Sequence, residues 1–346
     1  MDLLTQGLVG SAAAQSFSGP KTQYRAALCG ALAGMAPDLD ALIRSPDDPL
    51  LNLEYHRHFS HALAFIPLGA LIVALLIWLA SRRRWSFRQT YTACLLGYGS
   101  HGLLDACTSY GTYLFWPFSS QSVSWNLVSI IDPLFTLPLL FLTILAVWRR
   151  RAWMARLAAI YCIGYLLLAA GQHRRAGVAQ SELIIQRNHG AVRKIIKPSI
   201  GNVFLHRSVY LHDGVYYVDA IHVFPGLPAK LYPGGKIKAM GVQEVLPRIK
   251  DNSRQAKDVS RFSEFSGGYL CRHPELDDVL GDIRYAMLPT STVPLWGIKV
   301  NSGNPESPPE FVKSRKLEEG QMDHFFGMLL RRDSPAGNKE QDGRRN

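Results

Sequence analysis

The sequence predicts an α-helical integral membrane domain of about five to six apolar helices, followed by a small β-rich soluble domain. The chain of 346 residues is 47% hydrophobic and only 19% charged, which is little charge for a soluble protein. Residues 1–148 hold eight of the 38 basic residues and eight of the 27 acidic ones, so the net charge of +11 belongs to residues 149–346. This division excludes a single soluble globular domain.

Three apolar segments come first. Leu3–Phe17 is short for a membrane span, and Ala26–Ile43 is interrupted by a proline and two aspartates. Ala62–Ala80 holds nineteen residues without a charge. As a helix it would extend about 28 Å, close to the thickness of a hydrocarbon core, so we expect it to cross the membrane.

Three further segments complete the predicted membrane domain. Gln89–Cys107 is a weaker span because it contains a histidine and an aspartate. Ile130–Trp148 and Ala152–Ala170 each contain a single charged residue, near the start, and both are good spans.

Basic residues indicate the orientation, because the cytoplasmic loops of membrane proteins are enriched in Lys and Arg. Ser81–Arg88 and Arg149–Arg151 mark one side as cytoplasmic, whereas the opposite loop, Thr108–Ser129, carries no charge. This orientation places four polar segments, and the chain after Ala170, at the outer face: Asp2–Gln6, Asp38–His61, His101–Cys107 and Ile131–Asp132.

The second half of the chain alternates apolar and polar residues as strands do, in Ser208–Val218 and Ala220–Phe224. Pro225-Gly226 and Pro233–Gly235 are typical of turns. The predicted organisation is therefore a membrane domain over residues 1–171, a β-rich extracytoplasmic domain over 172–332 and a disordered polar tail over 333–346.

Ionisable residues inside a bilayer are energetically costly, so each one needs a partner or a function. His101 and Asp105 are four residues apart, so on a helix they project from one face and could offer two ligands to one metal ion. A structural pairing near the end of the helix is the alternative.

Three histidines precede the third apolar segment. His58 and His61 share a helical face, whereas His56 can meet His61 only from the loop before the helix. Ser60 could cap that helix, which would leave His61 in its first turn. A solvated polar edge is the alternative interpretation of this cluster.

Asp38 and Asp40 offer hard oxygen ligands for a divalent cation, although such a pair is also a normal helix exit. The predicted topology brings these aspartates, the histidine cluster and the His101 pair to one face, which favours a hydrolytic metal centre. Asp132 is a candidate for acid–base catalysis or for a contact to a ligand histidine. Arg57 could hold an anionic substrate group, or it could simply snorkel to the interface.

These motifs resemble the YdjM-like family of bacterial inner-membrane metal-dependent hydrolases. The resemblance covers about residues 1–150 and rests on six segments: Met1–Gly10, Pro37–Asp40, His56–His61, His101–Asp105, Thr108–Thr112 and Trp116–Phe118. In the second half, Arg261–Ser266 and Asp282–Tyr285 look like segments that longer members carry.

The resemblance implies six metal ligands, with His58 outside the set: Asp38, Asp40, His56, His61, His101 and Asp105. The family usually has Thr-His near its start, where this chain has Thr5-Gln6. Glutamine is a poor ligand for zinc. Either the site has one ligand fewer, or Gln6 contacts a ligand rather than the metal.

The sequence thus favours a membrane-bound metal-dependent hydrolase with its site at the outer face of the bacterial inner membrane. The expected cofactor is a divalent metal ion, zinc as the commonest hydrolytic choice, or manganese or iron. Expected partners are membrane lipids and an amphiphilic or small-molecule substrate, such as a lipid-like ester or phosphodiester, and no nucleic acid. The oligomeric state stays open.

Two other interpretations use the same features differently. A non-enzymatic protein could bind or transport a metal ion, although transporters hold their ions near the bilayer midplane and these residues cluster toward one face. Alternatively, the membrane half could anchor a basic domain that binds anionic lipid. In that domain His206 and His222 are interpreted as ordinary strand residues, and Lys194 and Lys197 as part of a solvated basic face.

Overall fold

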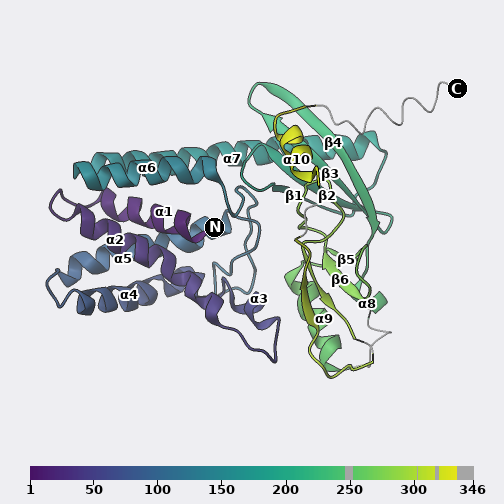
Figure 1. Cartoon of the computed structure of the whole chain (residues 1–346), viewed down its shortest axis with the longest axis horizontal. Helices are drawn as coiled ribbons and strands as arrows, with labels where there is room; N and C mark the ends of the chain where they lie inside the picture. Colours follow the sequence, from purple (N-terminus) through teal and green to yellow (C-terminus); the bar gives the residue numbers. More distant parts are fainter. Residues whose placement is uncertain (246–251, 302, 316–318, 333–346) are drawn as a thin grey trace. The chain divides into compact units, whose positions relative to one another are not determined.

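The computed structural model of the chain describes residues 1–245, 252–301, 303–315 and 319–332 (Figure 1). A helical first half is followed by two antiparallel four-stranded sheets. The chain forms two compact units, of which the first comprises Met1–Arg44, Leu51–Gly171 and Ile200–Asn202, and the second Ser45–Leu50, Gln172–Ser199 and Val203–Asn346. The tail expected over 333–346 lies outside the described residues.

The first unit is built from α-helices and three short 3₁₀ helices. In chain order these are α1 (Leu3–Ser16), α2 (Gln23–Met35), η1 (Ala36–Leu42), α3 (Leu51–Tyr55), η2 (Phe59–His61), η3 (Leu63–Phe65), α4 (Ile66–Ala80), α5 (Phe87–Ala106), α6 (Pro133–Arg149) and α7 (Ala152–Gln186). The second half of α7 belongs to the other unit. Asp2 and Asp132 begin α1 and α6 by accepting hydrogen bonds from backbone N–H groups of the first turn.

Within the described residues, two stretches are long and apolar enough to cross a membrane, Leu63–Ala80 and Ala152–Gln186, and α6 is a shorter apolar helix. The expectation of about five to six spanning helices is therefore not met. The helices α1 and α2 have 14 and 13 residues, fewer than the roughly 20 that a hydrocarbon core requires. The 20-residue helix α5 is long enough, but it carries several polar side chains.

The helices α1, α2 and α5 pack with their backbones in direct contact. A Cβ atom added to Gly10 would lie 2.4 Å from the carbonyl oxygen of Gly30, and one added to Gly97 would lie 2.3 Å from the same oxygen. Only glycine permits this approach, which is the way small residues let helices pack closely in membrane proteins. The contact holds the middle parts of α1, α2 and α5 at fixed separations.

Among its described residues, the second unit contains both sheets, the second half of α7 and three further helices. The first sheet has the order β1 (Arg193–Pro198), β2 (Leu205–His212), β3 (Val215–Phe224) and β4 (Leu227–Lys238). The second has the order β5 (Leu270–Arg272), β6 (Val279–Asp282), β7 (Trp296–Lys299) and β8 (Glu310–Lys313), and the helices are α8 (Val242–Val245), α9 (Arg254–Phe265) and α10 (Gln321–Leu329).

The observed strands differ in detail from the predicted ones. The segment Ser208–Val218 is two strands, because Asp213 and Gly214 adopt φ angles of 48° and 71° and form a tight hairpin turn between β2 and β3. Pro225-Gly226 forms the next turn, as expected. Pro233–Gly235, by contrast, lies inside β4, where the pairing with β3 shifts register.

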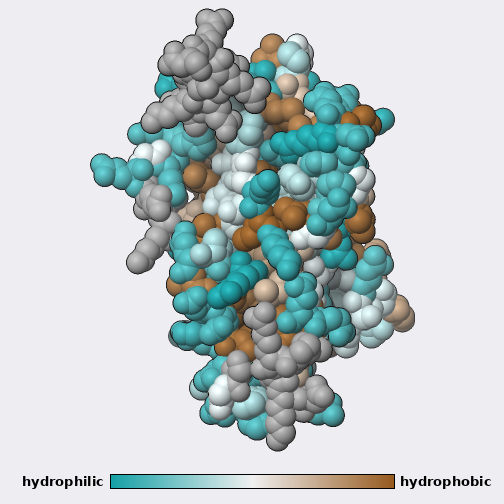
Figure 2. All heavy atoms as spheres, turned by 90° about the vertical axis from the view of Figure 1, so that its right-hand side faces the viewer, coloured by the Kyte–Doolittle hydropathy of each residue, from teal (hydrophilic) through white to brown (hydrophobic). Residues whose placement is uncertain are grey.

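The first sheet is covered on both faces. Ile196, Ile221 and Val223 are buried against Ala176 and Ala179 of α7. A separate cluster joins side chains of β2, β3 and β4 to Phe325 and Met328 of α10. Figure 2 shows one face of this unit, on which hydrophilic side chains dominate and hydrophobic ones are scattered.

Candidate metal centre

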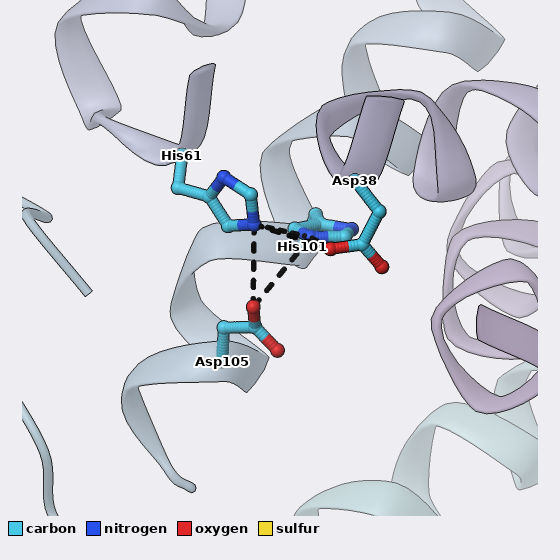
Figure 3. Close-up of side chains that lie close together, drawn as sticks. All are labelled: Asp38, His61, His101 and Asp105. Carbon is cyan, nitrogen blue, oxygen red and sulfur yellow. Dashed lines mark hydrogen bonds and ion pairs between the residues drawn. The ribbon is translucent and has the colours of Figure 1, made fainter. Parts of the chain in front are cut away.

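Four side chains from three elements of the first unit converge on one point (Figure 3). Asp38 comes from η1, His61 from η2, and His101 and Asp105 from one face of α5. One ligand atom from each lies within 4.8 Å of all the others, so the four could hold one metal ion. The predicted i, i+4 pair on α5 thus faces the residues that the motifs predicted as its partners.

The two imidazoles point their Nε2 atoms at each other, 2.8 Å apart. The Oδ1 atom of Asp38 lies 3.5 Å from each of these nitrogens. The Oδ2 atom of Asp105 lies 3.3 Å from His61 Nε2 and 3.7 Å from His101 Nε2. The side chains of His61, His101 and Asp105 are fully buried, whereas that of Asp38 is 18% exposed, so the group is open on the side of Asp38.

The partners of the two Nδ1 atoms fix the tautomers. His101 Nδ1 lies 2.6 Å from the carbonyl oxygen of Gly34, which can only accept, so this nitrogen carries the proton. His61 Nδ1 lies 3.1 Å from Asp40 Oδ2, an acceptor as well. Both Nε2 atoms therefore point into the centre of the group, where a bound cation would take their lone pairs in place of a proton.

Further observations fit a cation at this position. Asp105 Oδ2 is completely buried and has the Arg57 guanidinium and the His61 imidazole as its charged neighbours, at 3.0 Å and 3.3 Å. Burial disfavours the charged form of His61, but the carboxylates of Asp105, Asp38 and Asp40 outweigh burial and raise the pKa of His61 to about 10. The carboxylates therefore favour positive charge at the centre of the group.

Asp38 also belongs to a second group of possible ligands, with Asp40 and His56. His56 Nδ1 lies 2.8 Å from Asp40 Oδ1, and the His56 side chain is 22% exposed. Burial opposes ionisation of Asp40, yet its hydrogen bonds with His56, His61 and Ser60 prevail and lower its pKa. The structure thus brings together all six residues expected as ligands, in two adjoining groups that share Asp38.

Arg57 is buried behind this centre. Its Nε lies 3.0 Å from Asp105 Oδ2, and its Nη1 donates to Thr108 Oγ1 at 2.7 Å. Its backbone N–H, held at a φ of 69°, donates to Asp40 Oδ2 at 3.0 Å. The interpretation of Arg57 as a snorkelling interface residue is wrong, because the residue is only 3% exposed and positions Asp105 and Asp40.

Asp132 belongs to neither group of possible ligands. Its carboxylate accepts hydrogen bonds from the backbone N–H of Leu134 at 3.1 Å and from Tyr165 Oη at 2.7 Å. The expected acid–base role is therefore not supported by its contacts, which are those of a helix cap. The sequence located Asp132 correctly at the start of a helix, and its role in catalysis stays a prediction.

Other groups surround these ligands, among them Gln6, for which a contact to a ligand was one of the two alternatives expected, and Ser60, which was expected to cap a helix. Gln6 is fully buried and donates through Nε2 to Asp105 Oδ1 at 2.8 Å, so it contacts a ligand, and the Met1 amino group lies against the same oxygen. Ser60 does not cap a helix through its side chain; its Oγ donates to Asp40 Oδ2 at 2.6 Å. The backbone carbonyl of Gly34 orients His101, and no pattern of side chains in the sequence could have predicted this contact.

Comparisons with known proteins bear on the first half of the chain. No curated protein and no solved structure matches the chain. A family model described as the YdjM inner membrane protein matches residues 1–176, which contain every side chain of the metal centre. Because this match spans more than half of the 346 residues and agrees with the motifs from which the resemblance was inferred, the chain belongs to the YdjM inner membrane protein family.

Proposed function

We propose that this protein is a metal-dependent hydrolase of the bacterial inner membrane. In this proposal the metal centre opens at the outer face and the β-rich unit is extracytoplasmic. The observation that carries it is the pair of Nε2 atoms of His61 and His101, 2.8 Å apart and facing two carboxylates. Mixed imidazole and carboxylate ligands suit zinc, manganese or iron. Such an ion would supply the Lewis acidity that polarises a substrate and activates water for hydrolysis.

His56 is the best placed residue of the site to move a proton. Its Nδ1 is held by Asp40 at 2.8 Å, which leaves Nε2 free to exchange a proton with water or with a leaving group. Its side chain is 22% exposed, whereas those of His61 and His101 are fully buried. We therefore infer that a substrate approaches from the side of Asp38 and His56, with Asp40 keeping His56 in the productive orientation.

The burial of His61, His101 and Asp105 supports an amphiphilic substrate. The ligands lie on helices of an inner-membrane family, and three of the four side chains in the first group have no exposed surface. A substrate whose polar ester or phosphodiester lies at the membrane surface would present that group to the open side. A lipid-like ester or phosphodiester is thus the substrate class we propose.

The first experiment is elemental analysis of detergent-purified protein. The wild type should contain stoichiometric zinc, manganese or iron, and His101→Ala and Asp105→Asn should lose it while still inserting into membranes. His58→Phe is the matched control, because His58 lies in the same motif but outside both ligand groups and packs against Tyr113 and Trp116. A normal metal content in His101→Ala would contradict the proposal.

The second experiment separates catalysis from binding. The probes are bis(4-nitrophenyl) phosphate, a phosphodiester, and short-chain nitrophenyl esters. The metal-loaded wild type should hydrolyse one of these two kinds of ester, and a chelator should abolish the activity. His56→Gln should keep a metal ion held by the group of Asp38, His61, His101 and Asp105, to which His56 does not belong, and lose about 10²–10⁴-fold in kcat, the range typical of a lost general acid or base. Metal-dependent uptake into vesicles without any hydrolysis would instead favour a metal carrier.

A further inference from the structure

A cavity of about 460 Å³ lies in the first unit, where α2 and α5 begin. The turns between α1 and α2 and between α4 and α5 lie at the same end of the helices (Figure 1). The residues that line it include Thr22, Arg25, Trp85, Ser86, Arg88 and Gln89, and no acidic residue. From Arg88 to His101, α5 rises about 20 Å along its axis, so this cavity is separate from the metal centre.

Arg25 and Arg88 lie in the first turns of α2 and α5. Positive charge there opposes the helix dipole, and neither first turn contains an acidic residue to offset it. Among the described residues, neither arginine forms an ion pair with a carboxylate. The guanidinium carbon of Arg25 lies 5.4 Å from the centre of the Trp85 ring, a contact that holds this charge beside the cavity.

Both helices also begin without a side-chain cap. Thr22 and Ser86 occupy the capping positions, yet neither side chain accepts a hydrogen bond from its own helix. The hydroxyl of Thr22 instead donates to the carbonyl oxygen of Gly19 at 3.1 Å. Two arginines and two uncapped helix starts therefore border one cavity, and all of them are complementary to an anion.

We propose that this cavity binds the phosphate group of an anionic phospholipid in the cytoplasmic leaflet. Phe17, Trp85 and Leu96 line the same cavity and offer apolar surface to the acyl end of a lipid, which a free phosphate ion does not have. The loop Ser81–Arg88, which marks the cytoplasmic side, leads into the cavity, and anionic lipids concentrate in that leaflet. The site does not depend on the function proposed for the metal centre.

The test is lipid binding by native mass spectrometry of the full chain released from detergent. The probes are dioleoyl phosphatidylglycerol, dioleoyl phosphatidylcholine and inorganic phosphate. Wild type should bind phosphatidylglycerol, and Arg25→Gln/Arg88→Gln should bind it about tenfold more weakly, since each arginine supplies a charge-assisted hydrogen bond. Arg82→Gln/Arg84→Gln is the matched control, because these arginines are exposed like Arg25 and Arg88 and lie in the adjacent turn, but do not line the cavity.

Thermal unfolding distinguishes binding from a structural role. Added phosphatidylglycerol should raise the Tm of the wild type and of the control, but not that of Arg25→Gln/Arg88→Gln. Without lipid, the double variant should be at least as stable as the wild type, because it loses two charges that oppose the helix dipoles. Equal binding of phosphatidylglycerol by the wild type and by Arg25→Gln/Arg88→Gln overturns the proposal. Stabilisation by inorganic phosphate as large as that by phosphatidylglycerol overturns the assignment to a lipid.

Discussion

Arg261 of α9 donates to both carboxylate oxygens of Asp48, at N···O distances of 3.1 Å and 3.0 Å. Asp48 lies in the loop between the two segments that carry Asp40 and His56, and this loop belongs to the second compact unit. Arg254 of the same helix donates to the carbonyl oxygen of Asp47. The helix α9 thus anchors the segment that joins two parts of the metal centre.

Loss of this anchor should loosen the metal centre. Arg261→Ala removes a bidentate, partly buried ion pair, worth about 1 kcal/mol, and frees the loop between Asp40 and His56. We expect the metal to dissociate about fivefold faster into excess chelator. Arg272→Ala is the control, because its ion pair with Asp277 is exposed. Equal dissociation rates for both variants would show that the anchor does not act on the site.

Gly102 is expected to tolerate no side chain. A Cβ atom added there would lie 2.2 Å from the backbone oxygen of His61, so Gly102→Ala must displace a metal ligand. We expect a loss of about 1–3 kcal/mol in stability, as for other overpacked sites, together with loss of bound metal. At Gly99, one turn earlier, the nearest atom to an added Cβ is 3.6 Å away, so Gly99→Ala should melt like the wild type with full metal content.

Substitutions of Gln6 test whether this position, where the family usually has histidine, contributes to metal affinity. Gln6→Leu removes the hydrogen bond to Asp105 Oδ1, so the dissociation constant for zinc should increase about tenfold. Gln6→His should restore a donor to Asp105 and tighten zinc binding relative to the wild type. Competition with a fluorescent zinc chelator measures both constants. Weaker binding by Gln6→His than by Gln6→Leu would contradict a role for this position beside the metal.

Lys197 should destabilise the β-rich unit. It is 3% exposed, and among the described residues its Nζ has no hydrogen-bond partner, lying 3.2 Å from the centre of the Tyr285 ring. Burial, followed by the neighbouring Arg284, lowers the pKa of Lys197 well below its ordinary value. Lys197→Met should therefore raise stability by about 1–3 kcal/mol in denaturant unfolding. Lys194→Met, at an exposed position of the same strand, should change it little.

His206 should make this unit sensitive to acid. Burial, assisted by His173, lowers the pKa of His206 to about 3, whereas the unfolded chain titrates near 6.5. The unfolded state therefore binds the proton first, and stability falls as the pH drops from 6.5 toward 3, by about 1.4 kcal/mol per pH unit. His206→Gln should flatten this dependence in melts between pH 7 and pH 4. The partly exposed His212 on the same strand provides the control variant, His212→Gln.

The sequence predicted which residues of the candidate metal centre lie together, and less of what surrounds them. Spacing on α5 and the motif resemblance located His101, Asp105 and their partners, because ionisable residues in apolar segments stand out. The number of spanning helices was wrong because apolar composition does not reveal where a helix ends. Lys197 was interpreted as solvated, since the sequence of a short strand does not show that both its faces are covered.

The sequence could not predict contacts made by backbone atoms, or contacts between residues that are far apart along the chain. The Gly34 carbonyl that orients His101 leaves no trace in side-chain chemistry. The ion pair of Arg261 with Asp48 joins residues 213 positions apart, and a local pattern carries no information about such a pairing. Asp132 shows the opposite difficulty, because a buried aspartate at the start of a helix looks the same in sequence whether it caps the helix or performs catalysis.

The backbone contact of Gly10, Gly30 and Gly97 also has a thermodynamic consequence. Helices that touch in this way cannot slide or rotate, so the conformational entropy of arranging His101 and Asp105 is already lost when the protein folds. A cation that enters then needs little further ordering of the helices. Calorimetry of metal binding should accordingly show a heat-capacity change close to zero, whereas a site that folds around its ion would bury apolar surface and show a large negative one.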